Sequence, residues 1–373
     1  NLIYAAVLAL LSYVLLCVTN WKLKGWNGLA VSVVTVIYLV TCELAVVDPK
    51  EWHQIRGAQM VLSMKVISLA FDIDQGSVAD MPGLMEFCGY VFHVGSVIFG
   101  PWCSYQEYTN ILHQKDRKMD FYWVMKLTKS AVLALSCVVV STCFVHWLIL
   151  DGSWIWMVAY RDAQSFRFSH YFVCYISELT MTLSGLGATK ANGDVRWDLS
   201  VVRPLHVEFP RSLVEVVTNW HLPMHHWLKT YVFKTARPIG TFPAIFLTYA
   251  ASSLLHGLNF QLAAVLLSLG FYSYVEYVLR NRIATLFSTC VQAKKCRTDC
   301  GHHYTNMHPM VIAANVAFSF VVVFHLAYLG LMFDSSAEEE EGYTMAHTLG
   351  KWSELNYASH WVALATFIFY MLA

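Results

Sequence analysis

The chain has 373 residues, of which 57% are hydrophobic and 13% are charged. Soluble globular domains carry about 25% charged residues, so this composition excludes an ordinary soluble protein and favours one embedded in a membrane. The formal net charge is zero, and we therefore expect no nucleic-acid partner. Apolar stretches long enough to cross a bilayer recur along the chain, which predicts a single integral membrane domain over residues 1–373.

Apolar segments of membrane-crossing length set the expected order of helices. Two of them are imperfect, because the third contains Lys65 and the fourth contains His93 ahead of Gly100 and Pro101. Broken helices at membrane depth occur where they line a protein-buried cavity. We see no repeat of fixed period, which weakens the case for an inverted-repeat transporter. The expected spans are about 2–18, 28–47, 55–73, 84–103, 121–150, 168–187, 239–257, 259–279, 310–332 and 354–373.

The region between the sixth and seventh spans is more polar. Residues 188–210 contain Gly193 and two prolines, which predicts a polar surface loop. Residues 211–234 interleave aromatic side chains with histidine and lysine and are interrupted by Pro223, which disfavours a continuous helix. We therefore expect this second segment to be amphipathic and to lie at the cytosolic membrane interface.

Loop charges orient the second half of the chain. Basic clusters lie at 229–237 and 280–297, and an acidic run lies at 338–341. Basic loops favour the cytosol, so the span that follows the first cluster is expected to run outward and the next one to return. The acidic run is then lumenal and the C-terminus cytosolic.

Most of the ten cysteines lie in apolar segments, where a small buried hydrophobic side chain is the simplest interpretation. The exception is a loop in which Cys290, Cys296 and Cys300 precede His302. These residues could supply zinc ligands, but zinc sites usually show a tight cysteine pair and a well-separated second pair. We expect a local disulfide, lipidated cysteines or free thiols here, and no metal site.

His256 is an ionisable residue inside the apolar run 239–271. Polar and charged groups at mid-membrane cost up to about 3 kcal/mol. On a helix, His256 would share one face with Tyr249 and Ser252, and a neutral buried imidazole can act as a general base. The alternative is a packing histidine bonded to a neighbouring hydroxyl. Packing or loop positions are the expected role of His170, His325, His347 and His360.

A second polar patch spans residues 219–227 and places three histidines around Pro223. Trp227 and Tyr231 are also typical of an interfacial aromatic belt. Nearby basic side chains would suit the phosphates of a nucleotide-bearing cosubstrate and equally the headgroups of anionic lipids. These basic residues are Lys229, Lys234 and Arg237.

A W-x-x-P-x-x-x-W segment, here Trp220 to Trp227, followed by the L-L-H-G of residues 254–257, resembles the membrane-bound O-acyltransferase family. The resemblance implies a helical bundle of roughly 9–11 spans enclosing a tunnel, with His256 catalytic and assisted by the residue after the first tryptophan. Within the family, the chain resembles members that transfer palmitoleate to a serine of Wnt proteins in the endoplasmic reticulum. That likeness rests on residues 208–234, 249–271, 324–334 and 351–361, and more weakly on 99–102 and 168–178.

The same resemblance implies the substrates and the remaining site residues. Palmitoleoyl-CoA would be the cosubstrate on the cytosolic side, a Wnt serine the lumenal acceptor and membrane lipids the surroundings, with no tightly bound cofactor. The catalytic half would be about 195–373. The assisting residue is expected to be asparagine, but this chain has His221, whose N–H could serve instead. The residues expected to bind cosubstrate or line the tunnel are Trp220, Trp227, Tyr231, Lys234, Tyr249 and Ser252.

Two alternatives stay open from the sequence. Within the acyltransferases, the acceptor could be a different secreted protein or a lipid. Outside enzymes, a transporter could place His256 and Lys65 on a proton or substrate path.

Overall fold

The computed structural model describes residues 2–22, 24–113, 119–191, 194–297, 299–333 and 344–372. Helices dominate these residues, and within them one two-stranded hairpin is the only sheet. The predicted all-α class is therefore confirmed. The acidic run 338–341, which we expect to be lumenal, lies outside the described residues.

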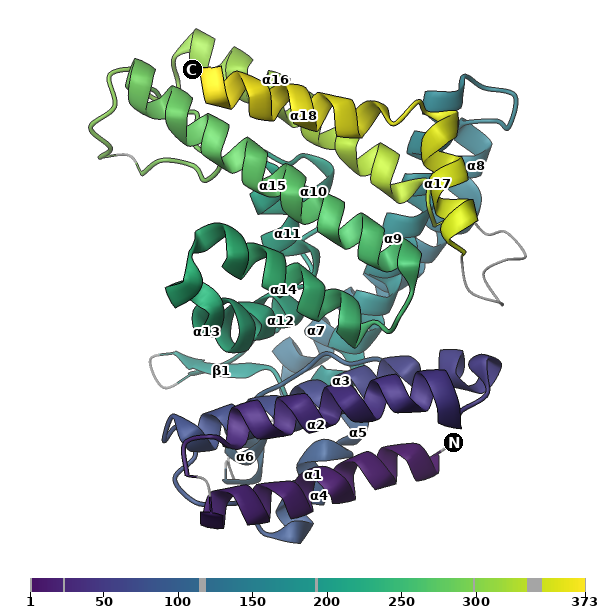
Figure 1. Ribbon diagram of the computed structural model, residues 1–373, viewed down its shortest axis with the longest axis vertical. Helices are drawn as coiled ribbons and strands as arrows, with labels where there is room; N and C mark the ends of the chain where they lie inside the picture. The colour runs from purple at the N-terminus through teal and green to yellow at the C-terminus, as the bar shows by residue number, and fades with distance from the viewer. Residues whose placement is uncertain are drawn as a thin grey trace.

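Three long helices form the N-terminal layer of the molecule, drawn in purple in Figure 1. Asp74, at the end of the third, accepts hydrogen bonds from Asn27 Nδ2 and from the backbone N–H of Gly28, both at 2.7 Å. The start of the second helix is thereby held against the end of the third. The helices are α1 (Leu2–Lys22), α2 (Asn27–Thr41), which continues as the π-helical η1 (Cys42–Val46), and α3 (Pro49–Asp74).

The expected span 84–103 is wrong as a continuous helix, because the chain breaks after each of two short helices. These are α4 (Leu84–Val91) and α5 (Val94–Val97), followed by α6 (Tyr105–His113). Lys65 of α3 is fully buried and donates hydrogen bonds to the carbonyl oxygen of Tyr90 at 2.8 Å and to Ser96 Oγ at 2.7 Å. The ammonium group thus supplies hydrogen bonds to a backbone carbonyl at the end of α4 and to a hydroxyl in α5.

The next two long helices pack side by side and carry paired charges. They are α7 (Phe121–Val139), continued by η2 (Val140–Phe144) and α8 (Val145–Leu148), and α9 (Ile155–Leu183). Helix α9 begins well before the expected start at 168. The additional turns contain charged residues that the hydropathy pattern placed outside the span. One of them is Arg167, whose Nε forms an ion pair with Glu208 Oε1 at 2.9 Å.

The prediction of a polar surface loop over 188–210 is only partly right. Residues Ala188–Ala191 and Asp194–Trp197 form the antiparallel strands β1 and β2. Beyond the hairpin, Val201, Val202 and Val207 are buried in the protein, since the chain turns inward before the short helix α10 (Leu205–Glu208).

The placement of residues 211–234 at the membrane interface stays a prediction, but two aromatic side chains of the segment are buried inside the protein. Trp227 and Tyr231 are 3% and 5% exposed and belong to the core of the N-terminal layer, whereas Leu213 and Val216 belong to the core formed by α9 and the C-terminal helices. The segment therefore connects two cores. Its elements are α11 (Leu213–Trp220), α12 (Leu222–Trp227), the π-helical η3 (Leu228–Phe233), α13 (Lys234–Ala236) and the 3₁₀ turn η4 (Arg237–Ile239).

The C-terminal helices form the opposite end of the molecule, in green and yellow in Figure 1. They are α15 (Phe260–Phe287), α16 (Pro309–Gly330), α17 (Met345–Glu354) and α18 (Ala358–Leu372), and they follow α14 (Thr241–Leu255) in the chain. In the same view α14 lies between the purple N-terminal layer and the α15–α18 group.

Membrane crossing is supported by length and hydropathy. Within the described residues, five helices qualify by both criteria, and α14 and α18 are shorter apolar helices. Large apolar side chains such as Leu10, Val132 and Phe320 point outward, as expected of a lipid-facing surface. The protein is a polytopic membrane protein, while the expected count of roughly 9–11 crossings and the tunnel stay predictions.

Candidate active site

His256 lies in the turn between α14 and α15. Its backbone N–H donates to the carbonyl oxygen of Ser252 at 3.2 Å, so the residue ends the helix. Gly257 follows with φ +97°, and a Cβ there would lie 2.8 Å from Glu43 Oε1. The Glu43 carboxylate accepts the backbone N–H of Leu258 at 2.9 and 3.0 Å. Backbone conformation and lack of space together require the glycine of the L-L-H-G motif.

Helix α14 is shorter than the thickness of a bilayer. The helix has 15 residues, which is about 22 Å at 1.5 Å per residue. The hydrocarbon core of a bilayer is about 30 Å thick. If α14 starts at one membrane face, it is too short to reach the other, and His256 would then lie inside the hydrocarbon thickness.

The ring of His256 has no hydrogen-bond or ring-stacking partner in the described part of the chain, and its side chain is half-buried. The alternative of a packing histidine predicted a bond to a neighbouring hydroxyl. Two other histidines do have such bonds, since His325 Nδ1 contacts Ser359 Oγ, and His360 Nδ1 lies 3.0 Å from the hydroxyl of Tyr328. The packing role expected for His325 and His360 is confirmed, and His256 differs from both.

His221 interrupts the chain between α11 and α12. Its backbone is extended, with φ −151° and ψ 93°, and its Nδ1 accepts the backbone N–H of Met224 at 3.1 Å. A neutral imidazole that accepts at Nδ1 carries its proton on Nε2. Burial, with a smaller contribution from nearby His256, lowers the pKa of His221 to about 4. The side chain is therefore a neutral N–H donor at pH 7.

The structure brings His170 into the same group, which the sequence analysis missed. Its ring stacks on Trp220 with centroids 4.4 Å apart and lies 6.0 Å from the ring of His221. Both His170 and His221 are in electrostatic range of His256. The weak family likeness over 168–178 was the only sequence signal that pointed to this residue.

The structure separates the other expected site residues into two groups. Trp220 stacks on His170 and is part of the histidine group. Trp227 and Tyr231 lie in the core of the N-terminal layer: the indole N–H of Trp227 donates to the carbonyl oxygen of Met64, and the Tyr231 hydroxyl donates to Asp72 Oδ1, both at 2.9 Å. Their role in lining a tunnel stays a prediction.

The remaining expected residues lie on α14 and just before it. Ser252 is buried one turn before His256. Tyr249 packs its ring against Gly270 of α15, where a Cβ would lie only 2.7 Å away. This close contact holds the α14–α15 hairpin together, and a cavity shared by Tyr249 and His256 stays a prediction. Lys229, Lys234 and Arg237 are exposed and form one basic strip along η3, α13 and η4.

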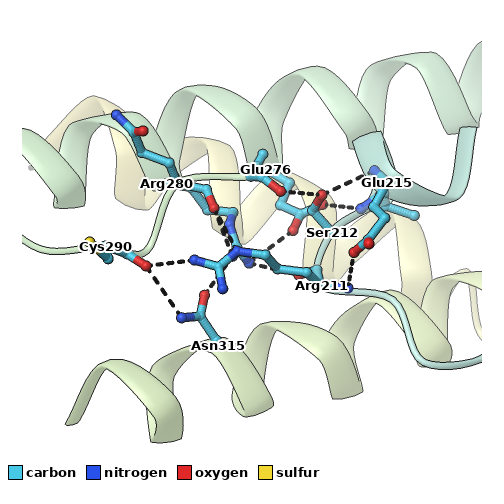
Figure 2. A network of polar contacts seen from close by, with 10 residues as sticks. Arg211, Ser212, Glu215, Glu276, Arg280, Cys290 and Asn315 are labelled. Carbon is cyan, nitrogen blue, oxygen red and sulfur yellow. Dashed lines mark hydrogen bonds and ion pairs between the residues drawn. The ribbon is translucent and has the colours of Figure 1, made fainter. Parts of the chain in front are cut away.

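A polar network attaches α11, which leads to His221, to α15, which follows His256 (Figure 2). Glu276 of α15 accepts the backbone N–H of Leu213 at 2.7 Å, at the positive N-terminal end of α11. Ser212 Oγ caps the same end by accepting the N–H of Glu215 at 3.1 Å. These buried polar contacts hold the start of α11 against the middle of α15.

A large hollow of about 1350 Å³ lies between α7, α9 and the β-hairpin. It is lined by Lys126, Glu178 and Arg196 among others, and its lining includes neither His221 nor His256. The hollow therefore lies apart from the two candidate catalytic histidines.

The histidine group supplies two functions that acyl transfer needs. A neutral imidazole without a protein partner can accept a proton from a hydroxyl. A fixed N–H donor in electrostatic range of it can stabilise the negative charge that develops on a carbonyl oxygen. The arrangement suits attack of an alcohol on an ester or thioester in a protein interior.

Comparison with known proteins agrees with this chemistry. The family model for the membrane-bound O-acyltransferase family matches residues 33–298. The chain is 45% identical to the protein-serine O-palmitoleoyltransferase porcupine of Mus musculus and to that of Homo sapiens, over all of this chain and 84% of each relative. It is 24% identical to lysophospholipid acyltransferase 6 of Drosophila melanogaster, over 54% of this chain and 34% of that protein. This chain therefore belongs to the membrane-bound O-acyltransferase family.

Proposed function

We propose that this chain transfers a palmitoleoyl group from palmitoleoyl-CoA to a serine hydroxyl of Wnt proteins. Relatives named as protein-serine O-palmitoleoyltransferases, 45% identical over the whole chain, support the reaction class. The observation that supports the site most strongly is His256 itself. Its imidazole lies in an apolar hairpin, lacks a protein hydrogen-bond partner in the described residues and is in range of the His221 donor.

The proposed reaction is a direct transfer. The serine oxygen attacks the thioester carbonyl carbon while His256 takes the hydroxyl proton. The carbonyl oxygen becomes negative and is stabilised by the Nε2–H of His221. The tetrahedral intermediate then collapses, the carbon–sulfur bond breaks, and the proton on His256 passes to the departing CoA sulfur. The products are a serine ester and free CoA.

Neighbouring residues hold His221 and His256 in position. Trp220 and His170 stack in parallel planes, with 5° between their rings, and this rigid pair lies directly before His221. Glu43 and Gly257 fix the turn after His256. A catalytic constellation must be held in place by its supporting contacts, and here both supports come from buried or half-buried groups.

The basic strip of Lys229, Lys234 and Arg237 would bind the phosphates of CoA on the cytosolic side. All three side chains are exposed, so they are accessible to a cosubstrate arriving from solution. In this proposal the Wnt serine arrives from the lumen, the C-terminus is cytosolic and the protein is a multi-pass component of the endoplasmic reticulum membrane. The positive-inside rule supports the orientation of the strip.

An acyltransferase that modifies a lipid is the second candidate function. Lysophospholipid acyltransferases of Drosophila melanogaster and Arabidopsis thaliana are 24–25% identical over slightly more than half of this chain, and the proposed base and donor would serve a lipid hydroxyl equally well. The transporter alternative has less support, because Lys65 is fully buried. Its ammonium group already donates hydrogen bonds to the carbonyl oxygens of Tyr90 and Val91 and to Ser96 Oγ.

One assay separates these functions. The purified chain is incubated with labelled palmitoleoyl-CoA together with either a folded Wnt serine-loop peptide or a lysophospholipid. We expect label on the peptide as a hydroxylamine-sensitive ester, and none on a peptide whose acceptor serine is replaced by alanine. Label on the lysophospholipid alone would support the lipid alternative, and uptake into vesicles without any transfer would support a transporter.

A further inference from the structure

The loop between α15 and α16 brings four potential metal ligands together. Cys290, Cys296, Cys300 and His302 each place one ligand atom so that all four atoms lie within 4.8 Å of one another. The spacing C-x₅-C-x₃-C-x-H has no tight cysteine pair, which is why the sequence favoured other roles for these thiols. The fold, rather than the spacing, collects the ligands.

The distances between ligand atoms match a tetrahedral zinc site. Zinc–sulfur bonds of about 2.3 Å and zinc–nitrogen bonds of about 2.0 Å require ligand atoms about 3.5–3.8 Å apart in a tetrahedron. The Sγ atoms of Cys290 and Cys300 are 3.3 Å apart, and His302 Nδ1 is 3.7 Å from the Sγ atoms of both Cys290 and Cys296. We infer that this Cys₃His cluster binds one structural zinc ion.

The surroundings of the cluster suit the charge of such a site. Three thiolates, one neutral imidazole and Zn²⁺ have a net charge of about −1. Arg211 is in electrostatic range of Cys290 and Cys296, and Lys294, Lys295 and Arg297 lie in the same loop. A disulfide would use only two of the three sulfurs, whereas a zinc ion uses all three and the imidazole.

The loop is closed on itself around the ligands. The N–H of Cys290 donates to the carbonyl oxygen of Tyr304 at 2.9 Å, and the N–H of Tyr304 donates to Ser288 at 3.0 Å. Ser288 has a left-handed backbone, with φ 49°. The first and last parts of the loop thus lie side by side, and a metal ion would fix the residues between them.

The same loop supports the helix that leads to His221 (Figure 2). The carbonyl oxygen of Cys290 accepts from Arg211 and from Asn315 Nδ2, and the carbonyl oxygen of Ala293 accepts from Ser212 Oγ at 2.9 Å. Arg211 and Ser212 immediately precede α11, and Ser212 is its N-cap. A bound zinc would therefore stabilise the positions of α11, α15 and α16 relative to one another.

Metal content tests the inference directly. The full-length protein is purified in detergent through a tag that binds no metal, and zinc is measured by plasma mass spectrometry. We expect about one zinc per chain in the wild type and at least about a tenfold loss in the double variant Cys296→Ser/Cys300→Ser. The matched double variant Cys17→Ser/Cys143→Ser changes two cysteines away from the loop and should keep its zinc.

Histidine variants distinguish a zinc ligand from a general loss of folding. His302→Cys should retain about one zinc, because zinc accepts four cysteines, and His303→Ala should retain it because the ring of His303 contacts Tyr304 instead. His302→Ala should bind zinc more weakly than either. A wild type without zinc, or with a disulfide or an acyl group on these cysteines, would overturn the inference, as would equal zinc in His302→Ala and His303→Ala.

A second readout uses the wild type alone. In native protein we expect Cys296 and Cys300 to be protected from a maleimide reagent until a zinc chelator is added, and the midpoint of thermal unfolding to fall after chelation. Immediate labelling of both thiols, with no effect of the chelator on labelling or unfolding, would contradict a zinc site.

Discussion

The turn between α14 and α15 and the contact between α16 and α18 both place imidazoles in apolar surroundings, but they treat them differently. At the α16–α18 contact, His325 and His360 bond to Ser359 and Tyr328. At the turn, His256 has no such partner in the described residues. The first region uses histidine for packing, whereas the second leaves an imidazole free for a substrate.

Replacing a histidine by alanine should therefore affect activity in one region and stability in the other. His256→Ala should lower palmitoleoyl transfer by about 10²–10⁴-fold, the usual contribution of a positioned base, with little change in thermal unfolding. His325→Ala should lower the unfolding midpoint, because Ser359 loses its buried partner, while transfer per folded molecule stays within about threefold of the wild type. Both are measured with purified protein in the labelled palmitoleoyl-CoA assay and by thermal denaturation.

Near-normal transfer by His256→Ala would remove this residue from the mechanism. If both variants lost activity and thermal stability together, His256 and His325 would both have a structural role, and the two regions would not differ.

The glycine after His256 provides a smaller perturbation of the same region. Gly257→Ala should reduce transfer by about tenfold, because left-handed backbone strain of about 1–3 kcal/mol and the contact with Glu43 shift the imidazole. Gly152→Ala is the matched control, since a Cβ there meets nothing within 4 Å. Equal rates for the two variants would mean that the turn tolerates movement and that Glu43 does not position His256.

The sequence predicted the parts of this architecture that depend on local composition. Long apolar segments predicted α1, α2, α7 and α16 well, because hydrophobic length alone determines such helices. The interruption near His93 was visible as well, but the compensating bonds of Lys65 to the broken helix were not, since they join residues 25 or more positions apart.

Prediction was weakest where tertiary contacts override local pattern. Trp227 and Tyr231 match an interfacial aromatic belt by composition, yet Met64 and Asp72 of α3 draw them into a core. The role of His170 depends on its stacking against Trp220, fifty residues away in the chain. The cysteine loop has an uninformative spacing, and only its folded form brings four ligands together.

The smallest expected effect concerns His221, which occupies the position where the family resemblance implies asparagine. His221→Asn should retain or raise transfer. Asparagine caps helices well, so its Oδ1 would accept the N–H of Met224 as Nδ1 does now, and its Nδ2 would replace the Nε2–H donor. His221→Ala removes both groups and should cost about tenfold or more in transfer.

The pH dependence of this pair sharpens the test. Because burial lowers the pKa of His221 to about 4, the imidazole is neutral at any pH above that value and gains a proton only as the pH falls through it. Asparagine does not titrate, so the ratio of the wild-type rate to the His221→Asn rate should stay constant across the near-neutral range. A ratio that changes there would mean that His221 exchanges a proton during the reaction.

A loss in His221→Asn larger than that in His221→Ala would mean that an amide cannot replace the imidazole. A constant ratio, with His221→Ala the slower variant, would assign His221 the role of a fixed donor and leave His256 as the base.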